Sequence, residues 1–149
     1  MIWNIAFVIA LLQQPVVMPK VTVGLLGGQE VTLSGAEFSG FINGPISDAV
    51  VIYHQRGVHG QMPVTNISRI EFGAYAKGKP FVLWLTLKNG QKLEVESERH
   101  DFVTVSGRTD LGHVRINHPD PLAAPAHLST KRPDRKHDLT IQYLEFPTS

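Results

Sequence analysis

The chain contains no cysteine among its 149 residues. Disulfides, thiolate metal sites, Fe–S clusters and a cysteine nucleophile are therefore excluded. An excess of charge of one sign is also missing, because 14 Lys and Arg face 13 Asp and Glu and leave a formal net charge of +1. No long-range electrostatic field consequently favours nucleic acid or an anionic membrane as the partner.

A hydrophobic run long enough to span a bilayer, which takes about 20 residues, is absent from the sequence. The apolar stretch 2–12 is shorter and has the length of the apolar part of a secretory signal, although no Lys or Arg precedes it and no small-x-small site follows it. We expect residues 1–19 to be a leader or short anchor of a secreted or periplasmic protein. Residues 2–12 would then contact a membrane only if the leader is uncleaved. The alternative is a buried terminal helix or strand of a cytoplasmic protein.

Helical periodicity is also missing beyond residue 20, where apolar residues alternate with period two as in strands buried on one face. Val21, Val23 and Leu25 alternate before a Gly27-Gly28 turn, and the alternation resumes at Val31 and Leu33. The same design recurs around an Asn-Gly turn at 89–90, with apolar positions at 83, 85, 87, 93 and 95. Both segments predict β-hairpins.

Three blocks of the first half of the chain recur in the same order in the second half. The hairpins match with a constant shift, since 83 − 21, 90 − 28 and 95 − 33 all equal 62. Residues 51–64 match 103–116 with a shift of 52, and 67–72 match 141–146 with a shift of 74. Alternation alone would make any two strand-rich segments similar, but three shared identities favour an internal duplication: Gly-Gln after the turn, Arg with Gly four residues later, and Glu-Phe at the close.

The repeated blocks predict an all-β fold made of two tandem small antiparallel units, which form either two barrels or one fused sandwich. The first unit would span residues 20–73, and the second would span 80–146. We interpret the Pro-rich, basic segment 117–138 as an insertion in the second unit, and the Gly-rich segment 34–45 as a connection that interrupts the first. The N-terminal apolar segment is the best candidate for a helix.

Each half resembles the small SH3-like and Sm-like barrels in its glycine-turned hairpin, its central strand pair and its closing strand. The closing strand reads Ile-x-x-Ile-Glu-Phe at 67–72 and Ile-x-x-Leu-Glu-Phe at 141–146. The resemblance covers about 50 residues in each half. The chain is similar in particular to exported bacterial proteins of unknown function that carry such β units. This resemblance implies no catalytic residues. The Asp, Asn and Arg-Gly set of Sm proteins is missing, so RNA binding is not implied.

Carboxylates repeat every second residue after the second predicted turn. Glu94, Glu96 and Glu98 would share one face of a strand, while Leu93 and Val95 occupy the other face. Paired carboxylates are typical of glycosidases, but acid–base catalysis requires one desolvated group, and an exposed strand carries hydrated glutamates as a matter of course. Glu94, Glu96 and His100 are the catalytic candidates of an alternative in which the protein is a hydrolase with a His/Glu site between the two halves.

Histidines and arginines near the ends of the predicted strands are the candidates for a binding site. These candidates are His54, Arg56, His59, Arg108 and His113. Residues five apart on one strand point to opposite faces, so His54 and His59, or His113 and His118, would need an intervening loop to meet at one metal ion. We therefore predict no metal site.

Two further motifs suggest a phosphate or nucleic-acid ligand. Residues 73–80 have the glycine and lysine spacing of a phosphate loop, but Pro80 stands where Ser or Thr is needed and a strand follows in place of a helix, so we interpret the segment as a linker and expect no cofactor. The basic segment 131–137 supports a second alternative, a weak nucleic-acid binder.

No catalytic motif is complete in this chain. We therefore expect a non-enzymatic, exported binding module for a protein, a peptide or a surface glycan, which could bind through an open strand edge.

Overall fold

The computed structural model describes residues 19–25, 27–73, 79–98, 102–119 and 141–147. Their secondary structure is eleven β-strands and one 3₁₀ turn, so the predicted all-β class is confirmed. The strands are β1 (Lys20–Leu25), β2 (Glu30–Gly40), β3 (Ile42–Pro45), β4 (Val50–Gln55), β5 (Val58–Pro63), β6 (Ile67–Phe72), β7 (Val82–Leu87), β8 (Lys92–Ser97), β9 (Val103–Thr109), β10 (Gly112–His118) and β11 (Ile141–Glu145). The 3₁₀ turn spans Val64–Asn66.

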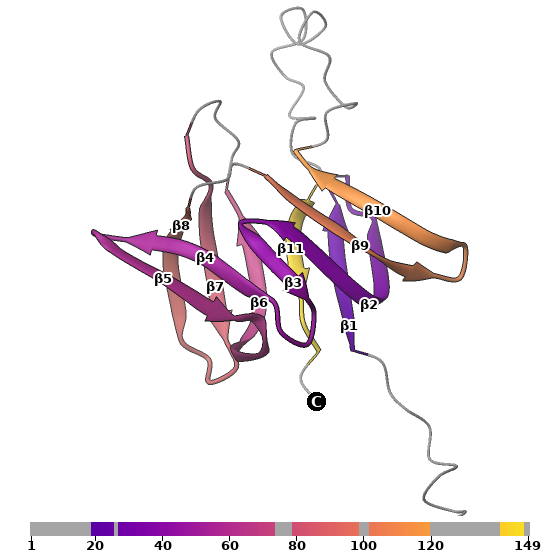
Figure 1. Cartoon of the computed structure of the whole chain (residues 1–149), viewed down its shortest axis with the longest axis horizontal. Helices are drawn as coiled ribbons and strands as arrows, with labels where there is room; N and C mark the ends of the chain where they lie inside the picture. The colour runs from indigo at the N-terminus through magenta and orange to yellow at the C-terminus, as the bar shows by residue number, and fades with distance from the viewer. Residues whose placement is uncertain (1–18, 26, 74–78, 99–101, 120–140, 148–149) are drawn as a thin grey trace, which may run out of the picture.

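Eight of the strands close into one antiparallel barrel. Their order is β1-β11-β6-β7-β8-β4-β3-β2, and β2 pairs with β1 to complete the ring. Two hairpins extend from the barrel: β5 adds to β4, and β9–β10 adds to β2. Figure 1 shows the tips of these two hairpins, β4–β5 and β9–β10, at opposite ends of the molecule.

The barrel interior holds the apolar positions that the alternation identified. Val21, Val23 and Leu33 of the first hairpin are fully buried, as are Leu83 and Leu85 of the second. A group of tilted aromatic rings, Phe41, Phe72 and Phe81, lies with its centroids between 5.7 and 6.4 Å apart. Closure of the sheet into a barrel buries this apolar surface, and this burial stabilises the fold.

The structure does not show the predicted two tandem units. Strand β11 lies between β1 and β6, and the hairpin β7–β8 lies between β6 and β4, so strands of 20–73 and 80–146 are interleaved in one barrel. Local apolar alternation specifies that each strand has one buried face, but it does not specify which strand is the neighbour. The predicted leader or helix at 1–19 lies outside the described residues, apart from Pro19.

The Gly-rich segment 34–45 is not the connection that we predicted. It forms the second half of β2 and all of β3, and its glycines bend the chain within the sheet. Gly40 has φ = +116°, and a Cβ at this position would lie 2.2 Å from the carbonyl oxygen of Phe102. Glycine is required here because the backbone of the neighbouring segment approaches so closely.

The two predicted hairpins are confirmed and pair in equivalent registers. Val21 pairs with Leu33 as Leu83 pairs with Val95, and both turns close with a hydrogen bond of 2.8 Å, from Leu25 to Gln29 and from Leu87 to Gln91. The strands that flank them also correspond, because Val23 of β1 pairs with Leu144 and Leu85 of β7 pairs with Ile70. The shift of 62 residues therefore relates the strand pairing of the two hairpins as well as their sequences.

The remaining hairpins correspond with a different shift from the one that the sequence suggested. The turn of β4–β5 lies between Gln55 and Val58, and that of β9–β10 lies between Thr109 and Gly112, so the shift is 109 − 55 = 54 and not 52. A slip of two residues preserves the alternation of inward and outward side chains, which is why the apolar pattern did not reveal it.

Candidate functional site

A groove opens on the outside of the barrel where β8 and β4 separate. The two strands pair only at Tyr53–Ser97 and His54–Glu96, and beyond these positions the β4–β5 hairpin projects away from the sheet. The groove has a volume of about 520 Å³. Its lining comes from β4, β7, β8 and the hairpin turn, and consists of His54, Gln55, Arg56, Gly57, Val82, Glu94, Val95 and Glu96.

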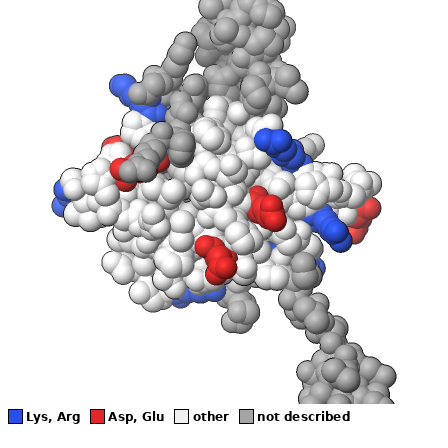
Figure 2. Space-filling model, in the orientation of Figure 1, with Lys and Arg blue, Asp and Glu red and all other residues white. Residues whose placement is uncertain are grey.

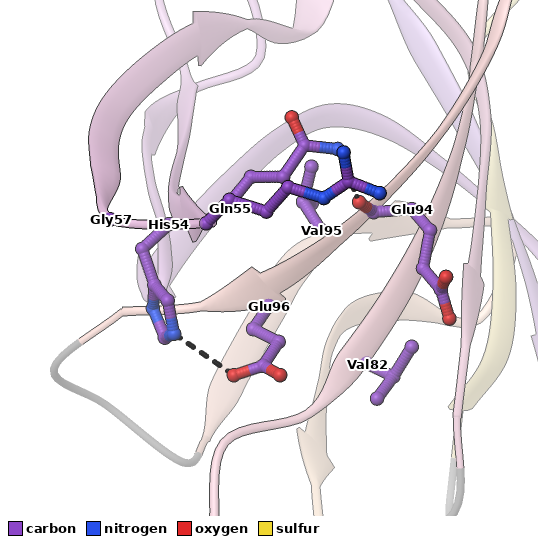
Figure 3. Close-up of a pocket in the computed structure, with 8 residues that line it drawn as sticks. His54, Gln55, Gly57, Val82, Glu94, Val95 and Glu96 are labelled. Atoms are coloured by element: carbon purple, nitrogen blue, oxygen red, sulfur yellow. Dashed lines mark hydrogen bonds and ion pairs between the residues drawn. The ribbon is translucent and has the colours of Figure 1, made fainter.

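The floor of the groove carries the two outward glutamates of β8. Val95 between them is buried, so Glu94 and Glu96 point away from the core as predicted. His54 Nε2 lies 2.9 Å from Glu96 Oε2, and the two side chains are 31% and 47% exposed. Figure 3 shows this pair on one side of the groove and the Glu94 carboxylate on the other. No ion pair engages the Glu94 carboxylate within the described part of the chain.

A side-chain hydrogen bond fixes the mouth of the groove. Gln55 Nε2 donates to the main-chain oxygen of Glu94 at 2.8 Å, which ties the end of β4 to β8 where their main chains no longer pair. Arg56 follows in the turn, where its φ of +48° is compatible with the two-residue hairpin. No sequence signal indicated this role for Gln55, because the apolar pattern does not identify the strand that lies beside β4.

A second histidine–glutamate pair lies next to the groove. His59 faces His54 across the β4–β5 hairpin with the ring centroids 5.9 Å apart, and its Nδ1 lies 2.7 Å from Glu98 Oε1. The hairpin turn is thus the intervening loop that two histidines five residues apart need in order to meet. Among the described residues, no group of three or more side chains is arranged to hold a metal ion.

The structure divides the other candidates between different places. Arg108 lies on β9 and His113 pairs with it on β10, so both belong to the hairpin at the far end of the barrel from His54 and His59. His100 lies outside the described residues. Most of the 73–80 segment and all of the basic segment 131–137 also lie outside them.

A buried histidine was not recognised from the sequence as part of the core. His118, at the end of β10, is fully buried between Phe72 and Phe81, with ring centroids 4.8 and 4.9 Å away. Its Nδ1 accepts a hydrogen bond of 2.9 Å from the main-chain N–H of Ile141, while Nε2 has no hydrogen-bond partner among the described residues. Desolvation lowers the pKa of His118 to about 3, so the ring is neutral near pH 7.

Charge is scattered over the face of the protein that Figure 2 presents. Acidic and basic side chains lie singly among uncharged ones, without a continuous basic stripe. In the described part of the chain, no helix is both long and apolar enough to cross a membrane.

Comparison with known proteins finds no match for this chain among family models, curated proteins or solved structures.

Proposed function

We propose that this protein is a non-enzymatic binding module, and that its β4–β8 groove takes a cationic side chain of an extended protein or peptide partner. The observation that carries the proposal is the pair of outward glutamates beside open space. Glu94 has no ion-pair partner in the described chain, and Glu96 has only His54. A Lys or Arg side chain entering the groove would therefore form charge-assisted hydrogen bonds without displacing a strong internal partner.

Two features next to the groove suit an extended ligand. Trp84 pairs with Glu94 across β7 and β8 and is 44% exposed, so its ring is available to stack on a cation or an apolar group. Strand β5, which follows the hairpin turn that lines the groove, pairs only with β4 among the described strands, and its outer edge can accept the main chain of another segment. A cationic peptide is favoured over a neutral surface glycan because two carboxylates face the one arginine of the lining, Arg56.

The proposal is tested by titrating the protein with a fluorescent Lys-rich peptide and a Glu-rich peptide of equal length. We expect only the Lys-rich peptide to bind, and its affinity to fall with rising salt. The double substitution Glu94→Gln/Glu96→Gln should weaken binding about tenfold or more, at roughly 1 kcal/mol for each charge-assisted contact.

Glu37→Gln is the matched control, because Glu37 is an exposed strand glutamate that lines neither this groove nor the opposite one. Equal binding of both peptides, or equal losses in the double variant and the control, would contradict the proposal. Selective binding of an uncharged glycan would contradict the proposed cationic partner and show that the partner is a glycan.

Export is part of the same proposal and is supported by the apolar segment 2–12. Expression of the full chain with a C-terminal tag, followed by fractionation and N-terminal sequencing, tests it. A tagged protein that stays in the cytoplasm with an intact N-terminus would contradict it.

Internal duplication is also part of the proposal and is supported by the pairing registers. Arg69 pairs with Glu145 and Glu71 with Tyr143, and these two pairs exchange under the shift of 74 that relates β6 to β11. Two related units that exchanged their first hairpins would give this arrangement. The shifts of 62, 54 and 74 would then reflect loops of different length.

The hydrolase alternative is supported by one observation. The groove holds two of its catalytic candidates, Glu94 and Glu96, together with His54 from the other predicted unit. Catalysis by these groups would need one of them to be desolvated, whereas Glu96 is 47% exposed. We therefore favour binding, and the nucleic-acid alternative through 131–137 stays a prediction.

A further inference from the structure

A second groove lies at the opposite end of the barrel, between β2 and the β9–β10 hairpin. Its volume is about 850 Å³. The lining residues are Lys20, Leu25, Glu30, Val31, Thr32, Ser34, Arg108, Thr109, Asp110, Leu111, Val114 and Ile116.

This groove occupies the same place in the pairing scheme as the first one. The pair His54–Glu96 joins β4 to β8, and the pair Arg108–Ser34 joins β9 to β2. The two pairs are related by the shifts of 62 and 54 residues, since 96 − 34 = 62 and 108 − 54 = 54. The same shifts relate further lining residues of the two grooves: Val82 to Lys20, Glu94 to Thr32, Gln55 to Thr109, Arg56 to Asp110 and Gly57 to Leu111.

The charges at these equivalent positions differ. The strand positions of the first groove carry two glutamates, whereas those of the second carry Lys20 and Arg108 and two neutral hydroxyl residues. The turn carries a cation in the first groove, Arg56, and an anion in the second, Asp110. The two grooves therefore occupy equivalent places in the pairing scheme, but the strands of the first present carboxylates where those of the second also present cations.

The cations of the second groove are available to a ligand. Lys20 and Arg108 are exposed, and neither forms an ion pair with another described residue. Glu30, the acidic side chain on the floor, interacts with the Tyr143 hydroxyl, and this hydrogen bond is the main cause of the raised pKa of Tyr143. The carboxylate of Glu30 thus already has a partner.

Apolar side chains line the rest of the groove. Leu25, Val31, Val114 and Ile116 are only partly buried against the core. Leu111, at the hairpin tip, is 95% exposed. An exposed leucine beside partly exposed aliphatic residues is a surface that gains free energy when an apolar ligand covers it.

We propose that this groove is a second binding site, which takes an acidic peptide segment carrying an apolar side chain. A carboxylate of the ligand is held by Lys20 and Arg108, the latter through a guanidinium that suits bidentate contact, while the apolar side chain packs against Leu111 and Ile116. The site is distinct from the β4–β8 groove and selects the opposite charge. The module would then join two segments of different charge, one at each end of the barrel.

The experiment uses the full chain and two fluorescent peptides, one of Glu and Leu residues and one of Lys and Leu residues, in separate and mixed titrations. We expect both peptides to bind together without competition. Lys20→Glu/Arg108→Glu should weaken the acidic peptide about tenfold or more and leave the basic peptide unchanged, because charge reversal at both contacts repels the ligand carboxylate.

Glu94→Lys/Glu96→Lys is the matched variant in the first groove and should affect only the basic peptide. Far-UV circular dichroism and the melting temperature verify that both variants fold. Loss of acidic-peptide binding only in the first-groove variant, or no binding of that peptide to any form, would overturn the second site while leaving the first intact. Concentration-dependent self-association that both variants abolish would also overturn it, because the occupant would be a second copy of this chain.

Discussion

His54 and Glu96 face each other across β4 and β8, with 2.9 Å between His54 Nε2 and Glu96 Oε2. His54 is the side chain that contacts a carboxylate of the groove floor within the described chain, and a cationic ligand would compete with His54 for this carboxylate. The pair therefore distinguishes the binding account from the hydrolase account, because the two assign opposite consequences to its loss.

The substitution His54→Gln tests that distinction. It removes the imidazole that contacts Glu96, and we expect the Lys-rich peptide to bind with equal affinity or up to about fivefold more tightly, since an exposed contact of this kind contributes at most about 1 kcal/mol. In a hydrolase the same change would remove a catalytic group and abolish turnover. A large loss of peptide affinity in His54→Gln, or turnover of a glycoside or ester that this variant lacks, would contradict the binding account.

The buried histidine predicts how stability depends on pH. Because the pKa of His118 is about 3 in the folded protein and about 6.5 in the unfolded chain, the unfolded state binds the proton first as the pH falls. The free energy of unfolding should therefore fall by about 1.4 kcal/mol for each pH unit below 6.5 and stop falling on this account near pH 3.

Urea unfolding at pH 6.5 and pH 5 measures this loss above the range in which most carboxylates protonate. His118→Phe should be less stable at pH 6.5 by about 1–3 kcal/mol, because the N–H of Ile141 loses its acceptor, but its stability should change less between the two pH values. A variant with the same pH dependence as the natural protein would show that other groups are responsible.

Gly40 and Gly27 both have a positive φ, so substituting each by alanine separates the cost of steric crowding from the cost of backbone strain. Gly40→Ala places a Cβ 2.2 Å from the Phe102 carbonyl oxygen, whereas Gly27→Ala, at φ = +102°, meets nothing within 4 Å. We expect Gly27→Ala to cost about 1 kcal/mol and Gly40→Ala to cost several kcal/mol more or to prevent folding. Melting temperatures of the two variants measure the difference, and equal values would argue against the close contact of β2 with the start of β9.

The sequence anticipated local structure better than long-range partners. The Gly-Gly and Asn-Gly turns identified the hairpins β1–β2 and β7–β8, because both signals are contained within a few residues. Alternation likewise identified the outward face of β8, which carries Glu94 and Glu96. The pairing of β1 with β11 joins residues more than 100 positions apart, and no local pattern encodes it.

The candidate site was anticipated in the same uneven way. His54, Arg56, Glu94 and Glu96 were singled out for their residue types, and the structure brings all four to one groove. The second groove was missed because the sequence comparison aligned Arg56 with Arg108. The structure instead aligns Arg108 with His54, and the difference in charge between the two grooves becomes visible only in that register.

The interleaved strands predict a single cooperative unfolding transition. Ile70 of β6 and Leu144 of β11 are fully buried and pair with each other, although they come from different halves of the chain. Ile70→Ala and Leu144→Ala should each lower the same transition by about 2–5 kcal/mol. Calorimetry that resolves two transitions, each sensitive to only one substitution, would instead support two independent units.

Backbone amide shifts in ¹H–¹⁵N spectra, recorded while the Lys-rich peptide is added, test the central claim most directly. Binding in the β4–β8 groove predicts shifts concentrated at His54–Gly57 and Glu94–Ser97, with the amides of β9 and β10 unchanged. Shifts that spread evenly over the barrel, or that concentrate on the β9–β10 hairpin, would contradict it.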